Sequence, residues 1–350
     1  MTISRREFLG AASVASLSLK QSLTSITRET ADRPVVIASA NGIRGVAKAY
    51  EMITKQNADT LDAIIAGVNI QELDPEDQSV GLGGLPNEEG VVQLDASCMH
   101  GPTRRAGAVG ALEGIATASS VAKAVMDHTD HIFLVGADAK RFALSMGFKE
   151  QNLLTEKSRQ DWLKWKACNN NEHRRASSDP GVIKYTHGTI HMNAVNVAGE
   201  MSSVTTTSGL SWKVPGRVGD SAVVGAGQYC DQTVGAAGST GLGEANIKVC
   251  GGFLIVEYMR QGMTPEAACL KTIERVIAMT EKRLLDEKGR PRFDLSFYAL
   301  RKDGVFGGAS AYSGFQYAVC DSAGARLIDS AYAFKSSERP ADPAPVCRRA

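Results

Sequence analysis

The 350 residues are enough for one large domain or two ordinary ones with a substantial buried core. The 39 lysines and arginines nearly balance the 38 aspartates and glutamates, and a net charge of +1 without long charged blocks argues against nucleic acid or an anionic membrane as partner. The absence of any run of about 18 apolar residues argues against a membrane-spanning helix.

The seven cysteines and six histidines form no metal-binding motif. The cysteines are scattered without a C-x-x-C pair, and their odd number argues against a complete disulfide framework. The histidines include no H-E-x-x-H and no repeated spacing. We therefore expect neither a metal nor a cofactor, and we expect most cysteines to be small buried apolar residues.

Residues 1–32 have the pattern of an export signal followed by a leader. Arg5-Arg6 precedes Phe8-Leu9 and a weakly apolar run at 11–19, an arrangement typical of a twin-arginine signal. The alternative is a disordered basic tail. Twin-arginine cargo folds before export, which is compatible with unpaired cysteines, so we expect a periplasmic or secreted protein.

The segment 33–188 opens with regular elements. Residues 35–39 predict a strand, and helical periodicity follows at 45–53 and 60–68. A glycine-rich loop at 80–86 leads into residues 91–96, which alternate as a half-buried strand does.

Small residues dominate 107–118, and 121–126 continues as helix. A short buried strand at 132–135 and a helix through Ala143 follow. The composition then shifts, and residues 168–182 cannot bury enough apolar surface to order themselves, which predicts a disordered linker.

The segment 189–350 begins with strand-like residues. The expected elements are strands from 189 and at 202–208, a helix at 247–258, a helix capped by Thr264-Pro265, a hairpin of 297–301 with 305–309, and a strand at 315–319. Helices cluster between groups of strands, which favours layered antiparallel sheets over a doubly wound parallel sheet. The glycines at 238–243 open no helix within a βαβ unit, so a Rossmann fold is disfavoured.

Four motifs occur in order through the second half of the chain. They are Thr186-His187-Gly188-Thr189-Ile190, Thr206-Thr207-Ser208-Gly209, Pro215-Gly216-Arg217-Val218-Gly219-Asp220-Ser221 and Ser239-Thr240-Gly241-Leu242-Gly243-Glu244. With them the sequence resembles the glycosylasparaginases, amidohydrolases with an N-terminal nucleophile, from Pro34 to about Asp321. The resemblance implies an α+β fold, the αββα four-layer sandwich of two stacked antiparallel sheets between helical layers. It also implies self-cleavage into chains 33–188 and 189–350, and a dimer of those pairs.

The resemblance places the cleavage before Thr189, with His187 and Gly188 preceding it. A threonine hydroxyl is a poor nucleophile without a nearby base. Cleavage would free the α-amine of Thr189, whose reference pKa of about 7.7–8.0 makes it an effective base on the same residue. Thr189 would attack its own preceding carbonyl, and strain at a glycine would assist.

The resemblance also assigns the remaining roles. Thr207 would hydrogen-bond Thr189, and Thr240 with the amide of Gly241 would form the oxyanion hole. Arg217 would grip the substrate's α-carboxylate and Asp220 its α-ammonium. Ser79 and Gly243 would add substrate contacts. Each has an ordinary alternative, namely a strand threonine, a turn, a surface ion pair or a loop serine.

Three positions depart from the pattern of glycosylasparaginases. Gly188 stands where that family has aspartate. A glycine at this position resembles the related plant-type asparaginases instead. Ala40, beside a one-residue deletion, stands where a tryptophan lines the sugar pocket. His191 replaces a glycine on the same strand face as Thr189, where it either crowds the site or packs harmlessly.

The sequence therefore predicts a self-processing enzyme that cleaves the side-chain amide of N4-(β-N-acetylglucosaminyl)-L-asparagine. The alternative is an L-asparaginase or β-aspartyl peptidase with the same nucleophile, which Gly188 and the missing tryptophan favour. An unprocessed, inactive paralogue that binds small amino acids is a third possibility. The intact nucleophile and binding residues argue against it.

Overall fold

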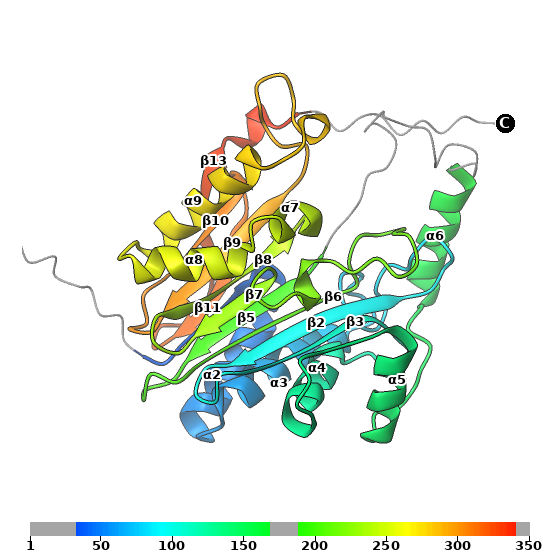
Figure 1. Cartoon of the computed structure of the whole chain (residues 1–350), viewed down its shortest axis with the longest axis horizontal. Coiled ribbons are helices and arrows are strands. Elements are labelled where there is room, and N and C mark those ends of the chain that lie inside the picture. Colours follow the sequence, from blue (N-terminus) through cyan, green and yellow to red (C-terminus); the bar gives the residue numbers. More distant parts are fainter. Residues whose placement is uncertain (1–32, 169–187, 341–350) are drawn as a thin grey trace, which may run out of the picture. The chain divides into compact units, whose positions relative to one another are not determined.

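The computed structural model of the chain describes residues 33–168 and 188–340 (Figure 1). Two β-sheets form within these residues. The strands of the larger sheet are β1 (Val35–Ser39), β2 (Gln93–His100), β3 (Arg105–Glu113), β4 (Phe133–Val135), β5 (Ile190–Val195), β6 (Met201–Thr207), β11 (Gln316–Asp321) and β12 (Gly324–Asp329). They lie in the order β12-β11-β1-β5-β6-β2-β3-β4, so β5 occupies the interior of the sheet.

The smaller sheet consists of strands from the second half of the chain. They are β7 (Gln228–Asp231), β8 (Gly235–Gly241), β9 (Leu295–Arg301), β10 (Phe306–Tyr312) and β13 (Ala331–Phe334). Their order is β13-β10-β9-β8-β7. The expected sandwich is confirmed, with one difference in detail: the sheets are mixed, because β3 pairs with β4 and β10 with β13 in parallel.

Helices cover the outer face of each sheet (Figure 1). Those on the larger sheet are α2 (Ile43–Lys55), α3 (Thr60–Glu72), α4 (Ala118–His128) and α5 (Gly136–Ser145), and those on the smaller sheet are α8 (Gly251–Arg260) and α9 (Pro265–Ala278). The remaining helices are α6 (Glu156–Cys168) and α7 (Gly243–Ile247), with short 3-10 turns η2 (Ala40–Gly42), η4 (Asp220–Ala222), η5 (Lys282–Leu284) and η6 (Ser336–Glu338). In the described part of the chain, no helix is long and apolar enough to cross a membrane.

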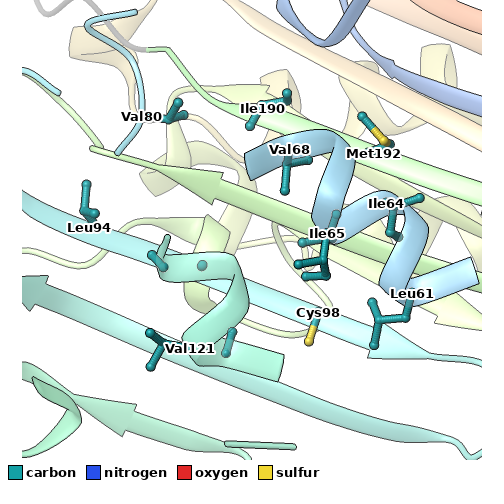
Figure 2. Close-up of a cluster of buried hydrophobic side chains, with 14 of the residues drawn as sticks. Leu61, Ile64, Ile65, Val68, Val80, Leu94, Cys98, Val121, Ile190 and Met192 are labelled. Atoms are coloured by element: carbon teal, nitrogen blue, oxygen red, sulfur yellow. The ribbon is translucent and has the colours of Figure 1, made fainter. Parts of the chain in front are cut away.

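The side chains of β5 alternate between two environments, as strand geometry requires. Ile190 and Met192 point to the helical side, where they join a buried apolar cluster with Ile64 and Val68 of α3 (Figure 2). Thr189, which directly precedes β5, and His191 therefore share the opposite face, toward the smaller sheet. Burial of the apolar face fixes the register of β5 and hence the direction of the residues that alternate with it.

Several predicted elements are confirmed by the structure. Strand β1 matches its predicted range, and Thr264 caps α9 by accepting a hydrogen bond from the backbone N–H of Ala267. Strands β9 and β10 pair as the predicted hairpin. Of the described cysteines, Cys98, Cys230, Cys269 and Cys320 are buried free thiols, whereas Cys250 is exposed.

Other predictions were wrong in ways that the packing explains. Residues 107–113 belong to strand β3, because small residues suit a strand covered on both faces. The short strand near 132–135 lies at a sheet edge and is largely exposed. The helix expected at 247–258 is split, because α7 ends at Ile247 and α8 begins only after Cys250, whose φ is 51°. The predicted linker 168–182 lies, after Cys168, outside the described residues, as do the leader and His187.

Candidate active site

The hydroxyl of Thr189 begins a continuous hydrogen-bond path to the carbonyl of the residue before it. Thr189 Oγ1 donates to Thr207 Oγ1 at 3.1 Å, and Thr207 Oγ1 donates to the carbonyl oxygen of Gly188 at 2.6 Å. The backbone N–H of Gly209 also donates to Thr207 Oγ1 at 2.9 Å. Thr207 therefore has its single proton committed to the Gly188 carbonyl, which it polarises.

Strand β1 and the turn after it hold Thr189 from the other side. The side-chain amide of Asn41 donates to the carbonyl oxygen of Thr189 at 3.3 Å. The Ser39 hydroxyl accepts from the backbone N–H of His191 at 3.2 Å and donates to Asn41 Oδ1 at 2.7 Å. Thr189 is buried in this setting, with 8% of its surface exposed. Its position is thus set by strands on both sides of β5.

Ser79 lies directly against Gly188. A β-carbon at position 188 would be only 1.8 Å from the β-carbon of Ser79, so this backbone path accepts glycine alone. Ser79 is held in turn by Asp77 Oδ1, which accepts from its backbone N–H at 2.8 Å and from its hydroxyl. A cavity of about 550 Å³ opens here, lined by Asp74, Glu76, Asp77, Gln78, Ser79, Leu85, Gly188 and Gly209.

Replacing Gly188 with alanine should slow self-cleavage by at least about tenfold, because the new methyl group displaces the carbonyl from Thr207. The second change Ser79→Gly removes the atoms that clash and should recover part of the rate. The measurement is the fraction of cleaved chain over time, by denaturing mass spectrometry. Equal rates for Gly188→Ala and the unaltered chain would show that the contact with Ser79 does not govern cleavage.

Arg217 lies close to the Thr189–Thr207 pair through Gly209. A β-carbon at position 209 would be 3.0 Å from Arg217 Nη1 and 2.9 Å from Lys213 Nζ, so two cationic groups flank this glycine. Arg217 forms a bidentate pair with Glu244, both bonds being 2.8 Å. Burial lowers the pKa of Arg217, but the bonds to Glu244 more than offset this and leave the pKa raised.

Asp220 faces the same region from the 3-10 turn η4. Its Oδ2 accepts hydrogen bonds from Ser239 at 2.6 Å and from Asn246 at 2.8 Å. A β-carbon at Gly243 would be 2.7 Å from Asp220 Oδ1 and 3.3 Å from Arg217 Nη2. The Asp220 carboxylate and the Arg217 guanidinium thus border one small space, which is open because residue 243 is glycine. Burial raises the pKa of Asp220, and the Asn246, Ser239 and Arg217 interactions oppose that shift.

The buried carboxylate of Asp95 fixes the loop that carries Arg217 and Asp220. Asp95 Oδ2 accepts from the backbone N–H of Gly219, and Oδ1 accepts from that of Ala111, each at 2.9 Å. One aspartate therefore ties the loop to strand β3 of the larger sheet. This contact joins residues 124 positions apart.

Thr240 and Gly241 end strand β8, two residues before Gly243. Gly241 has a φ of 125°, a conformation that favours glycine. The hydroxyl of Thr240 is hydrogen-bonded to the phenol of Tyr298 at 2.9 Å rather than to Thr189. Among the candidate residues, Thr240 is thus the one that the described contacts connect least directly to Thr189.

His191 is fully buried between the two sheets, so it packs rather than obstructs the cavity. Its ring lies against Gly238, where a β-carbon would be 2.2 Å from two ring atoms. The ring is nearly parallel to that of Tyr298, with centroids 6.2 Å apart. Burial lowers the pKa of His191 to about 3, and the neighbouring Asn193 side chain and Val204 backbone oppose this only partly. His191 is therefore neutral at neutral pH.

This buried neutral imidazole predicts an acid-sensitive fold. The unfolded chain takes up a proton near the reference pKa of 6.5 while the folded chain does not, so stability falls as pH drops below 6.5 toward 3. Between pH 7.5 and pH 5.0, we expect the free energy of unfolding of the unaltered protein to fall by about 2 kcal/mol more than that of the His191→Gln variant. Denaturant unfolding at both pH values measures this. A difference between the two proteins that is independent of pH would contradict it.

Four residues of the site were given no role from the sequence. Asn41, Glu244 and Tyr298 reach the site through contacts between distant segments, whereas Lys213 lies beside Gly209 in the same loop. Glu244 closes the fourth sequence motif, and the other three lie outside the motifs. Among the predicted residues, Thr189, Thr207, Gly188, Ser79, Arg217, Asp220 and Gly243 are joined by the contacts above, and His187 lies outside the described residues.

The sequence matches the family described as "Asparaginase" over residues 19–285. A protein of Elizabethkingia miricola named N(4)-(Beta-N-acetylglucosaminyl)-L-asparaginase is 37% identical over 343 residues, covering 96% of this chain and 97% of its own. The N(4)-(beta-N-acetylglucosaminyl)-L-asparaginase of Mus musculus is 39% identical over 241 residues, covering 62% of this chain and 69% of its own. The chain matches the family over most of its length, and it therefore belongs to the asparaginase family.

Proposed function

We propose that the protein is a self-processing amidohydrolase that cleaves N4-(β-N-acetylglucosaminyl)-L-asparagine to aspartate and an aminosugar. The observation that carries the proposal is the hydrogen-bond path from the Thr189 hydroxyl through Thr207 to the Gly188 carbonyl. The names of the relatives from Elizabethkingia miricola and Mus musculus, which specify this amide, support the choice of substrate.

The path supports self-cleavage. Thr189 Oγ1 attacks the Gly188 carbonyl carbon and passes its proton to Thr207, while the proton of Thr207 moves to the carbonyl oxygen. The tetrahedral centre collapses with rupture of the C–N bond, and the nitrogen of Thr189 takes up a proton. Water then hydrolyses the ester between Gly188 and Thr189 Oγ1, which leaves a carboxylate and a free α-amine.

The mature enzyme uses the same hydroxyl on the substrate. The α-amine of Thr189 removes the hydroxyl proton as Oγ1 attacks the side-chain amide carbon. The negative charge on the amide oxygen is met by Thr240 and the N–H of Gly241. The leaving nitrogen takes a proton, the aspartyl ester remains on Thr189, and water releases aspartate.

The substrate's amino-acid head group fits the space beside Gly243. Its α-carboxylate would displace Glu244 from Arg217, and the half-exposed Glu244 side chain can turn into water. Its α-ammonium would meet Asp220 Oδ1, which lies on the other side of that space. Lys213, 3% exposed beside Gly209, adds positive charge near the carboxylate.

The same machinery also suits L-asparagine or a β-aspartyl peptide. Ala40 begins the turn that carries Asn41, the residue bonded to the Thr189 carbonyl. A methyl group there offers no stacking face for a sugar ring. This position favours the second candidate function.

The test is hydrolysis by the purified protein, after its two chains have been identified by mass. The values of kcat/KM are compared for N-acetylglucosaminyl-asparagine, L-asparagine and a β-aspartyl dipeptide. A preference of tenfold or more for the first substrate supports the glycosylasparaginase proposal. A preference for either of the others assigns the alternative, and no hydrolysis by a fully cleaved protein rejects both.

Two further parts of the proposal concern location and assembly. We propose export through the twin-arginine pathway, on the basis of Arg5-Arg6 and the residues after them. Arg5→Lys with Arg6→Lys should then keep the protein in the cytoplasm of a host with that pathway. We also propose a dimer of cleaved pairs, which native mass spectrometry tests directly.

A further inference from the structure

The phenol of Tyr298 is joined to the hydroxyl of Thr240. Their oxygens are 2.9 Å apart, and this bond links strands β8 and β9. The pairing of these strands sets Thr240 opposite Ser296 and Gly238 opposite Tyr298. This register puts Tyr298 and Thr240 on the same face of the sheet, where the phenol reaches the hydroxyl.

The direction of this bond follows from what Thr240 must do. A threonine hydroxyl has one proton, and Thr240 needs it for the oxyanion of the substrate. Its oxygen must then accept, so Tyr298 donates. A hydroxyl that accepts one hydrogen bond is polarised and becomes a stronger donor in the next. Tyr298 would therefore fix the orientation of the Thr240 proton and strengthen its bond to the oxyanion.

The surroundings hold the Tyr298 ring in one position. The ring is 4% exposed, and Ser296 also hydrogen-bonds its oxygen. The imidazole of His191 lies parallel to it, in the space left by Gly238. The side-chain amide of Asn193 donates to the Tyr298 carbonyl at 3.5 Å. Two residues of the larger sheet thus brace a tyrosine of the smaller one.

We propose that Tyr298 is a positioning residue for the oxyanion donor Thr240, and that His191 braces Tyr298 in that role. The inference rests on the proposed function, because it needs Thr240 to meet an oxyanion. In this role His191, which departs from the family pattern, acts on Thr240 through Tyr298 and not directly on Thr189.

The experiment is a double-mutant cycle of Tyr298→Phe and Thr240→Ala, with kcat and KM measured on protein shown by mass to be fully cleaved. Tyr298→Phe removes one oxygen and should lower kcat about 5- to 20-fold with KM unchanged, because only the transition state carries the oxyanion. In the Thr240→Ala background the same change should have no further effect. Tyr312→Phe is the matched control, since it removes a buried phenol oxygen bonded to Pro291, and it should leave kcat unchanged.

An unchanged kcat for Tyr298→Phe, or an equal loss with and without Thr240, overturns the inference while the proposed function stands. An inactive, fully cleaved wild-type protein overturns both. If Tyr298→Phe does not fold, His191→Gln is measured in its place. That variant should lower kcat about 2- to 5-fold when Thr240 is present and have no effect in the Thr240→Ala background. An unchanged kcat with Thr240 present would overturn the inference.

Discussion

Thr189→Ala should leave the chain in one piece and lower amidohydrolase activity by at least about 10⁴-fold. The change removes the hydroxyl that donates to Thr207, so no atom remains to attack the Gly188 carbonyl. It also removes the proposed nucleophile of the mature enzyme, and without cleavage the α-amine that would serve as base stays bound in a peptide. The measurement is intact mass after long incubation, followed by an assay for released aspartate.

Thr189→Cys is the matched control for this variant. It keeps a nucleophilic atom at the same position and should retain some self-cleavage. Cleavage of the alanine variant at the same bond would show that another group or a protease performs it. The two variants therefore separate self-processing from cleavage by another agent.

Arg217→Ala should raise KM for an asparagine derivative about 100- to 1,000-fold. A substrate carboxylate held by a bidentate guanidinium loses both bonds, and a buried pair of this kind is worth several kcal/mol when one partner is removed. Arg217→Lys should recover only part of the loss, because an ammonium lacks the planar pair of donors. Self-cleavage should proceed in both variants, since Arg217 bonds to Glu244 and not to the Gly188 carbonyl.

Arg326→Lys is the control for this prediction. Arg326 forms a comparable bidentate pair with Asp321, at 2.6 and 2.7 Å, in the β11–β12 hairpin. Its replacement should leave KM unchanged. If Arg217→Ala were to raise KM for amides without an α-carboxylate by the same factor, Arg217 would not be the carboxylate ligand.

Local chemistry made much of the fold predictable. The Thr264-Pro265 start of α9 and the turn at Lys302-Asp303-Gly304 depend on neighbouring residues only. Strand β8 carries no such signal, because Gly235–Gly241 contains only small residues without apolar alternation. It becomes regular through pairing with β7 on one side and β9 on the other, which a sequence pattern does not encode.

The site likewise contains residues that local motifs predict and residues that only the folded structure reveals. Thr189, Arg217 and Asp220 could be named because they lie in short motifs. The partners that orient them could not, since Asp95 reaches Gly219 and Tyr298 reaches Thr240 only after the sheets have formed. For His191, strand alternation predicted the face of β5 on which it lies but not the residues it contacts. Gly238, which makes room for its ring, lies 47 positions away on the other sheet.

The strand order of the larger sheet has a consequence for a cleaved protein. Strand β1 belongs to the segment before the 188–189 bond, and it lies between β11 and β5, which belong to the segment after that bond. Strands β5 and β6 of the second segment lie in turn between β1 and β2 of the first. Cutting the 188–189 bond therefore frees neither chain, since each is hydrogen-bonded on both sides to the other. Thermal unfolding would separate the two chains, which must associate again in order to refold. The rate of refolding would therefore fall as the protein is diluted. The uncut Thr189→Ala chain would refold at a rate that dilution leaves unaltered.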